Sequence, residues 1–236
     1  MAQLPVGNRY SAPKVTTSDR TEWLMPAGLL ALCAIPIAAG TIRMLQIGTG
    51  AEITPENARF LAAPLPVVLH LGSSVVFCVL GPFQFSAGLR RRHPGWHRAS
   101  GRMLVACGLV AALSALWLTL SLPTGVEAPA TFDGSLVFAT RLLVGSAMTV
   151  FLCLGLAAAL RRDIPSHRAW MMRGYALGLG AGTQVFTHLP WFLFPGVQGE
   201  PARALCMAAG WGINYALAEW LISHPTPTAH ADNCRG

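Results

Sequence analysis

The sequence predicts an all-α integral membrane protein with six transmembrane helices. Apolar residues make up 53% of its 236 residues and charged residues only 11%, whereas soluble proteins carry about 25% charged residues. Six stretches are each long and apolar enough to cross a bilayer as a helix, which takes about 20 residues. The composition therefore excludes a soluble globule and a disordered chain. The net charge of +7 is spread over short loops, which argues against nucleic acid as a partner.

The predicted spans follow one another with short connections. An N-terminal tail of residues 1–23 precedes a six-span membrane domain of residues 24–223, and a flexible tail of residues 224–236 follows it. The spans cover residues 24–42, 61–85, 103–122, 135–160, 170–194 and 202–222.

The charges of the loops predict that both termini are cytoplasmic. Twelve Arg and Lys residues lie in the N-terminal tail and in the segments 90–102 and 161–173, and three lie in the loops of the other side. Cytoplasmic loops are enriched in these residues. The second and fourth connections should therefore face the cytoplasm.

The two basic segments resemble each other. Counted from Arg90 and Arg161, the next Arg, a Pro and the last Arg stand at offsets 1, 4 and 12 in both, and the His-Arg pairs differ by one position. Each segment joins an inward span to an outward one, as in a parallel repeat. We expect a pseudo-symmetric four-helix core of spans two to five, with spans one and six at its periphery. In this register His70 corresponds to Arg141.

Polar residues in the outer half of the spans form a candidate ligand site. His70 and His188 lie about 14 Å and 9 Å from the outer ends of their spans at 1.5 Å per residue, and Gln184 is one turn from His188. Such residues usually face the interior of a bundle. A haem b whose iron is bound by His70 and His188, with Arg141 and Gln184 beside it, is the leading expectation. Another ligand or proton site, and histidines that only pack, are the alternatives, and Arg141 could instead extend to the headgroups.

A second group of polar residues is expected to bind anions on the cytoplasmic side. Helix N-termini next to Arg side chains attract phosphate groups, including those of anionic lipid headgroups. For His97 and His167 the alternative is that they form a second pair of haem ligands. Glu219 in the sixth span is expected to pair with one of the loop arginines. The group comprises His97, Arg98, Arg102, His167, Arg168 and Arg173.

Three glycines of the fifth span stand four residues apart. Gly174, Gly178 and Gly182 therefore share one face of a helix. Such spacing is typical of close helix–helix packing. Room for a flat cofactor against the backbone is the alternative.

Three strings of residues carry a family resemblance. They are GPFQF at 81–85, HRASGR at 97–102 and HRAWMMRGYAL at 167–177. They resemble a large bacterial family of predicted multi-span membrane proteins of unknown function, with the pattern GPFQF, HRxxGR and HRxWMxRxYAL over about 60–195. The resemblance implies a multi-pass protein of the bacterial inner membrane and supplies no established activity.

The leading functional hypothesis is electron transfer by a haem protein with a redox partner. A small-solute or proton transporter that uses His70, Arg141 and Gln184 as a polar path is the second hypothesis. A non-catalytic subunit of a larger membrane complex is the third. The sequence does not decide whether the protein is an enzyme.

Overall fold

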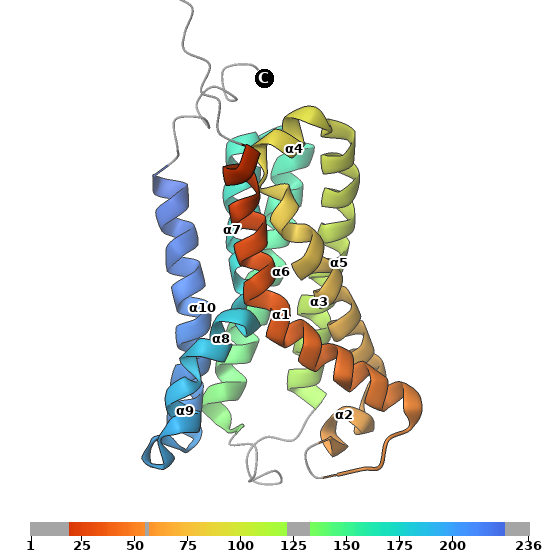
Figure 1. Ribbon diagram of the computed structural model, residues 1–236, viewed down its shortest axis with the longest axis vertical. Coiled ribbons are helices and arrows are strands. Elements are labelled where there is room, and N and C mark those ends of the chain that lie inside the picture. The colour runs from red at the N-terminus through yellow and green to blue at the C-terminus, as the bar shows by residue number, and fades with distance from the viewer. Residues whose placement is uncertain (1–18, 55–56, 122–132, 225–236) are drawn as a thin grey trace, which may run out of the picture.

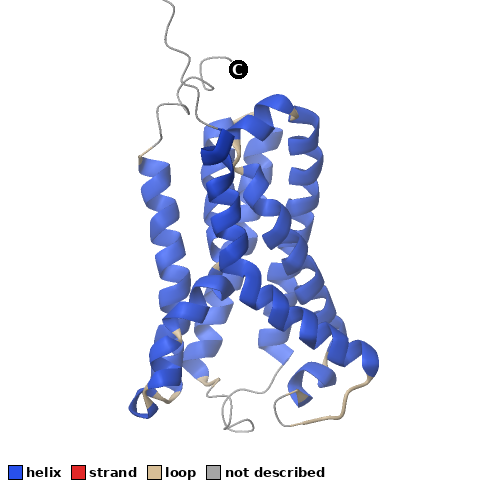
Figure 2. Ribbon diagram, in the orientation of Figure 1, coloured by secondary structure: helices blue, strands red, loops and turns tan. Residues whose placement is uncertain are grey.

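A computed structural model describes residues 19–54, 57–121 and 133–224. These residues form helices and their connections, and no strand occurs among them (Figure 2). The predicted all-α fold class is confirmed for this part of the chain.

Four of the predicted spans correspond to long apolar helices. Each is long and apolar enough to cross a membrane, and many of the large apolar side chains on their outer faces are exposed, as expected for contact with lipid. The four helices are α1 (Asp19–Thr49), α3 (Pro64–Gln84), α5 (Pro94–Ser121) and α6 (Ser135–Leu160).

The fifth predicted span is not one helix. It is divided into α7 (Ile164–Gly178), α8 (Gly180–Thr187) and α9 (Leu189–Leu193). The expectation of a continuous helix over 170–194 was wrong. Glycines flank the break at Leu179, and glycine is a weak helix former. A second break precedes Pro190, whose ring cannot continue a helix interior.

The sixth predicted span corresponds to α10 (Glu200–Ser223). This helix is long, but it is not among those with a strongly apolar window. Its polar residues Asn214 and Glu219 make contacts within the bundle.

The helices form a bundle whose two ends differ (Figure 1). Short α4 (Ala87–Arg92), the connection of α6 to α7 and the start of α1 lie at one end, here called the basic end. Short α2 (Ala58–Ala62) and α9 lie at the other end, here called the cavity end. Helix α5 packs between α3 and α6, while α10 packs against α6, α7 and α8.

The prolines shared by the two basic segments have the same local role. Pro94 is the first residue of α5, and Pro165 is the second residue of α7. Proline suits the first turn of a helix, where its missing N–H is not needed. The carboxylate of Asp163 also caps α7 by accepting a hydrogen bond from the backbone N–H of Ser166 at 3.2 Å. The repeated offset therefore marks two equivalent helix starts.

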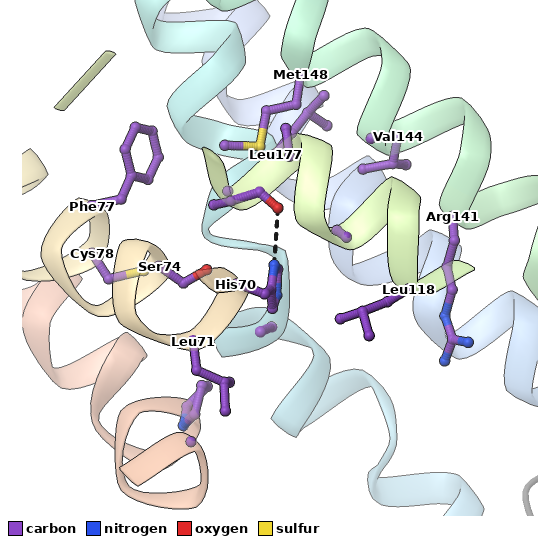
Figure 3. Close-up of a pocket in the computed structure, with 18 of the residues that line it drawn as sticks. His70, Leu71, Ser74, Phe77, Cys78, Leu118, Arg141, Val144, Met148 and Leu177 are labelled. Atoms are coloured by element: carbon purple, nitrogen blue, oxygen red, sulfur yellow. Dashed lines mark hydrogen bonds between the residues drawn. The ribbon is translucent and has the colours of Figure 1, made fainter. Parts of the chain in front are cut away.

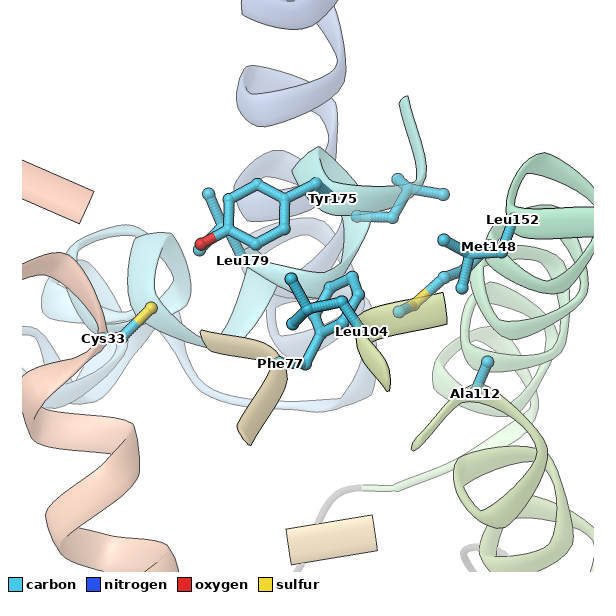
Figure 4. Packing of buried hydrophobic residues seen from close by; sticks show 9 residues of the cluster. Cys33, Phe77, Leu104, Ala112, Met148, Leu152, Tyr175 and Leu179 are labelled. Atoms are coloured by element: carbon cyan, nitrogen blue, oxygen red, sulfur yellow. The ribbon is translucent and has the colours of Figure 1, made fainter. Parts of the chain in front are cut away.

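The larger cluster of buried residues joins α1, α3, α5, α6 and α7 (Figure 4), and a smaller one joins the starts of α6 and α10. Phe77 and Tyr175 are centred 5.3 Å apart, and Phe85 lies 5.1 Å from Tyr175. A Cβ built at Gly81 would overlap the Tyr175 ring, so α3 and α7 approach closely here. Gly81, Phe85 and Tyr175 all belong to the strings that carry the family resemblance.

The glycine stripe of the fifth span serves close packing. A Cβ at Gly174 would lie 3.0 Å from Leu152 of α6, and one at Gly178 would lie 2.7 Å from Phe77 of α3. A Cβ at Gly182 would lie 2.6 Å from the backbone oxygen of Leu32 in α1. Each glycine thus faces a neighbouring helix, and Gly178 also borders a cavity.

Candidate functional site

A cavity of about 390 Å³ opens between the helices beside the buried core, with which it shares Phe77 and Met148 (Figure 3). Residues of α1, α2, α3, α5, α6, α7, α8 and α10 line it, and most of them are apolar. Its volume is within the range of small-molecule sites, about 300–1,000 Å³. Three of the polar residues singled out in the sequence are on its lining: His70, Arg141 and Gln184.

His70 is held in one orientation by a contact between α3 and α5. Its Nδ1 lies 2.9 Å from the backbone oxygen of Ala111 (Figure 3). A carbonyl oxygen only accepts hydrogen bonds, so Nδ1 carries the proton that is donated. In the neutral ring Nε2 then presents a lone pair. This is the tautomer of many metal-bound histidines, whose other ring nitrogen donates to a carbonyl.

Arg141 is tied to an acidic residue that the sequence reasoning missed. Its Nη1 lies 3.0 Å from Oδ2 of Asp133, and Nε of Arg203 lies 2.7 Å from Oδ1 of the same carboxylate. The Asp133 side chain is only 10% exposed. The feature of the sequence that could have identified Asp133 is its position two residues before α6, from which a carboxylate can reach the first turns of that helix.

The two arginines determine the charge state of Asp133. Burial opposes the ionisation of its carboxyl group. The charges of Arg141 and Arg203 and their hydrogen bonds outweigh this effect and hold the pKa of Asp133 below its usual range. The resulting ion-pair cluster joins the start of α6 to the start of α10.

Gln184 belongs to a polar contact between α8 and α10. Its Nε2 donates to the backbone oxygen of Met207 at 3.1 Å, and Oγ1 of Thr187 donates to that of Cys206 at 2.7 Å. Gly210 lets the helices approach, since a Cβ there would lie 2.6 Å from the Gln184 side chain. These contacts fix the Gln184 amide at the edge of the cavity.

His188 is not brought to the cavity that His70 lines. It ends α8, and its Nδ1 lies 2.8 Å from the backbone oxygen of Gln184, one turn earlier in the same helix. It is not on the cavity lining. One iron would need both Nε2 atoms about 2 Å from it. The geometry does not favour that arrangement, and the haem expectation stays a prediction.

The residues of the predicted anion site lie at the basic end. Arg98, Arg102 and Arg168 are exposed. Arg173 is instead paired with Glu219, through Nε to Oε1 at 2.6 Å and Nη2 to Oε2 at 2.9 Å. The expected pairing of Glu219 with an arginine of this segment is thereby confirmed.

The two histidines of this end differ in their hydrogen bonding. Nδ1 of His167 lies 2.8 Å from the backbone oxygen of Gly155. Nδ1 of His97 is buried and has no hydrogen-bond partner among the described residues. His167, Arg90 and Arg98 are close enough to His97 to act on its charge. His97 and His167 are therefore neighbours, but no group of three or more metal-binding side chains occurs in the described residues.

The long apolar helices identify this chain as a multi-helix membrane protein, and its bundle holds a cavity of the size of a small ligand. The chain belongs to the family described as "Predicted membrane protein (DUF2306)", whose model matches residues 67–222. This confirms the resemblance seen in the sequence. The match extends from α3 to α10 and so includes every helix of the cavity except α1 and α2. No curated protein and no solved structure matches the chain.

Proposed function

We propose that this membrane protein binds a small, mainly apolar ligand inside its helix bundle. The observation that carries the proposal is the cavity itself, where His70, Arg141 and Gln184 come together on an otherwise largely apolar lining. A few polar groups on apolar walls are typical of small-molecule sites. The ligand reaches the site from the bilayer, which dissolves apolar molecules.

Photolabelling tests this proposal. Protein in lipid nanodiscs is irradiated with an iodinated phenyl-diazirine, a small apolar carbene precursor, and labelled positions are mapped by mass spectrometry. Labelling of the inward-facing positions Ala111, Ala115 and Leu118 is expected. The Ala115→Phe variant, which fills the cavity, should lose that labelling and keep the labelling of lipid-facing Leu113. Equal labelling of these positions in both proteins would refute the proposal.

The proposed topology has six spans. The pair α7–α8 is the fifth and α10 is the sixth, and the basic end faces the cytoplasm of a bacterium whose inner membrane holds the protein. The support is the excess of Arg and Lys near that end and the common end at which α1 begins and α10 terminates (Figure 1). Topology reporters fused after Ile53 and after Ser223 should report opposite sides, and a common side would refute the arrangement.

The proposed core consists of two related hairpins, α3–α5 and α6–α7. The equivalent prolines at the starts of α5 and α7 support this relation. An experimental structure should superpose one hairpin on the other with His70 over Arg141. If the best superposition instead paired His70 with a lipid-facing residue, the two hairpins would not be related in this way.

Transport is a second candidate, favoured by the broken fifth helix. Leu177 and Gly178 precede the break, Ala181 and Gln184 follow it, and all four line the cavity. Transporter sites are often built from discontinuous helices. Flux of a fluorescent apolar cation or anion into proteoliposomes should then depend on the protein, and Ala115→Phe should abolish it.

Haem binding with electron transfer to a redox partner is a third candidate, favoured by the tautomer of His70. An absorption spectrum of purified protein decides it. A Soret band that His70→Ala abolishes and His93→Ala preserves would support haem. Protein without such a band, after expression with added haem precursor, would exclude it.

A further inference from the structure

The cavity lining carries the hydrogen-bond donors of Arg141, Ser74 and Trp211 and also hydrogen-bond acceptors, of which the ring of His70 is one. Nε2 of His70 makes no hydrogen bond among the described residues and is not sealed in the packing. Because Nδ1 donates to the Ala111 carbonyl, Nε2 of the neutral ring is an acceptor.

Gln184 adds a second acceptor from another helix of the lining. Its Nε2 donates to Met207 at 3.1 Å, which orients the amide. The carbonyl oxygen Oε1 has no partner among the described residues and is not buried. Gln184 and His70 both line the cavity, from α8 and α3.

The surroundings keep the His70 ring neutral. Its neighbours on the lining include the apolar side chains of Leu71, Leu118 and Val144 (Figure 3), and an unpaired charge among apolar groups is costly. The charged group on the same lining is the guanidinium of Arg141, which would repel an imidazolium. Among the described residues the acidic partner of Arg141 is Asp133, and Arg203 shares it.

We infer that the ligand class is a lipid-soluble alcohol or phenol, whose hydroxyl group donates a hydrogen bond to Nε2 of His70. This inference rests on the proposed binding function. A carboxylate or phosphate ligand is disfavoured, because it would compete with Asp133 for Arg141 and would face two acceptors. An aprotic hydrocarbon would leave both acceptors desolvated and unpaired, which costs binding energy.

Competition against the diazirine label tests the inference. The competitors are 1-naphthol, its methyl ether and 1-naphthoate, which share one ring system and differ in donor capacity and charge. In wild-type protein 1-naphthol should compete about threefold to tenfold more strongly than the ether, the range expected for one neutral hydrogen bond. The carboxylate should compete more weakly than the alcohol.

The His70→Leu variant is the matched control, since it removes the acceptor and retains an apolar side chain. It should bring 1-naphthol and its ether to equal potency, and continued competition by the ether would show that the variant is folded. Gln184→Leu removes the second acceptor, and comparing 1-naphthol with its ether in this variant tests that acceptor in the same way.

Three results would overturn the inference. Equal potency of alcohol and ether in wild-type protein removes the hydroxyl specificity but leaves the binding function standing. A stronger effect of 1-naphthoate assigns an anionic ligand instead. Failure of all three to compete, while the diazirine still labels the cavity, removes the inference and leaves the binding function standing.

Discussion

The basic end and the cavity end share the helices α3, α5 and α6 but differ in what these helices enclose, since His70 and Arg141 line a cavity toward the cavity end. At the basic end α3 and α7 approach so closely that a Cβ at Gly81 would overlap the ring of Tyr175. Gly72 of the same α3 is exposed on the outside of the bundle, and a Cβ there would have nothing within 4 Å. The three strings of the family resemblance lie at the tightly packed end. His70, Arg141 and Gln184 lie outside these strings.

The break at Leu179 contributes to the difference. Helix α7 packs on α6, whereas α8 packs mainly on α10 and α1 and runs in another direction from α7 (Figure 1). Small residues on the cavity lining, among them Ala111, Ala115 and Gly145, leave further room. The comparison therefore teaches that a change of helix direction and small side chains together leave space for a ligand here.

The largest effect is expected from crowding the basic end. Gly81→Val should lower the free energy of unfolding by about 3 kcal/mol, the upper end for an overpacked core, because its Cβ overlaps the buried Tyr175 ring. Gly72→Val, in open surroundings of the same helix, is the matched control and should cost less than about 1 kcal/mol. Thermal unfolding in detergent micelles measures both. Similar losses would contradict the close contact of Gly81 with the Tyr175 ring.

A smaller effect is expected from breaking the ion-pair cluster of the cavity end. Asp133→Asn should cost about 2 kcal/mol, below the usual 3–5 kcal/mol for a buried pair, because the side chains of Arg141 and Arg203 are 30% and 22% exposed. Asp163→Asn is the control, since Asn is an equally good helix cap and should change stability by less than about 0.5 kcal/mol.

The same cluster predicts a pH dependence. The pKa of Asp133 is lower in the folded protein than in the unfolded chain, so its stabilising contribution is complete above the unfolded value of about 3.9. It is lost as the pH falls through the folded value and the carboxyl takes up a proton. The melting temperature of wild-type protein should approach that of Asp133→Asn at low pH. A constant difference down to acid unfolding would contradict the ion-pair account.

The ion pair of the basic end is expected to contribute less. Arg173→Lys replaces a fork of two hydrogen bonds to Glu219 by a single point charge. The two side chains are 20% and 35% exposed, so the expected loss is about 0.5–1 kcal/mol. Chemical unfolding of Arg173→Lys, Glu219→Gln and the double variant measures the coupling. Additive losses would show that the pair contributes nothing.

The sequence was sufficient for much of the fold and for part of the candidate site. Hydropathy located the first four long helices, and membrane depth singled out His70, Arg141 and Gln184, because polar residues far from water tend to face the protein interior. The break at Leu179 was missed, since Gly178 was interpreted only as part of a packing stripe with Gly174 and Gly182. His188 was placed beside His70 on depth alone, which says nothing about the direction in which α8 turns.

Asp133 and Tyr175 show that the hydrophobic pattern of the sequence does not predict long-range contacts. Asp133 lies outside the predicted spans, so no membrane argument applied to it, and its partner Arg203 is 70 residues away in the chain. The sequence identified Tyr175 only as part of a motif. The structure shows that its ring lies between Phe77, Phe85 and Gly81. Such long-range contacts depend on how the helices cross, which hydrophobic periodicity does not specify.

The smallest effect on stability is expected from filling the cavity. Ala115→Phe adds a ring to a side chain that lines open space, so the gain from burying apolar surface should offset any repacking, and stability should change by less than about 0.5 kcal/mol. Ala158→Phe in α6 is the contrasting variant. Because Ala158 is 1% exposed, the added ring has no space, and the substitution should lower the free energy of unfolding by about 1–3 kcal/mol. Unfolding of both variants in the same micelles measures the difference. If Ala115→Phe is as costly as Ala158→Phe, the space beside Ala115 is not open in the folded protein, and the contrast between the two ends fails.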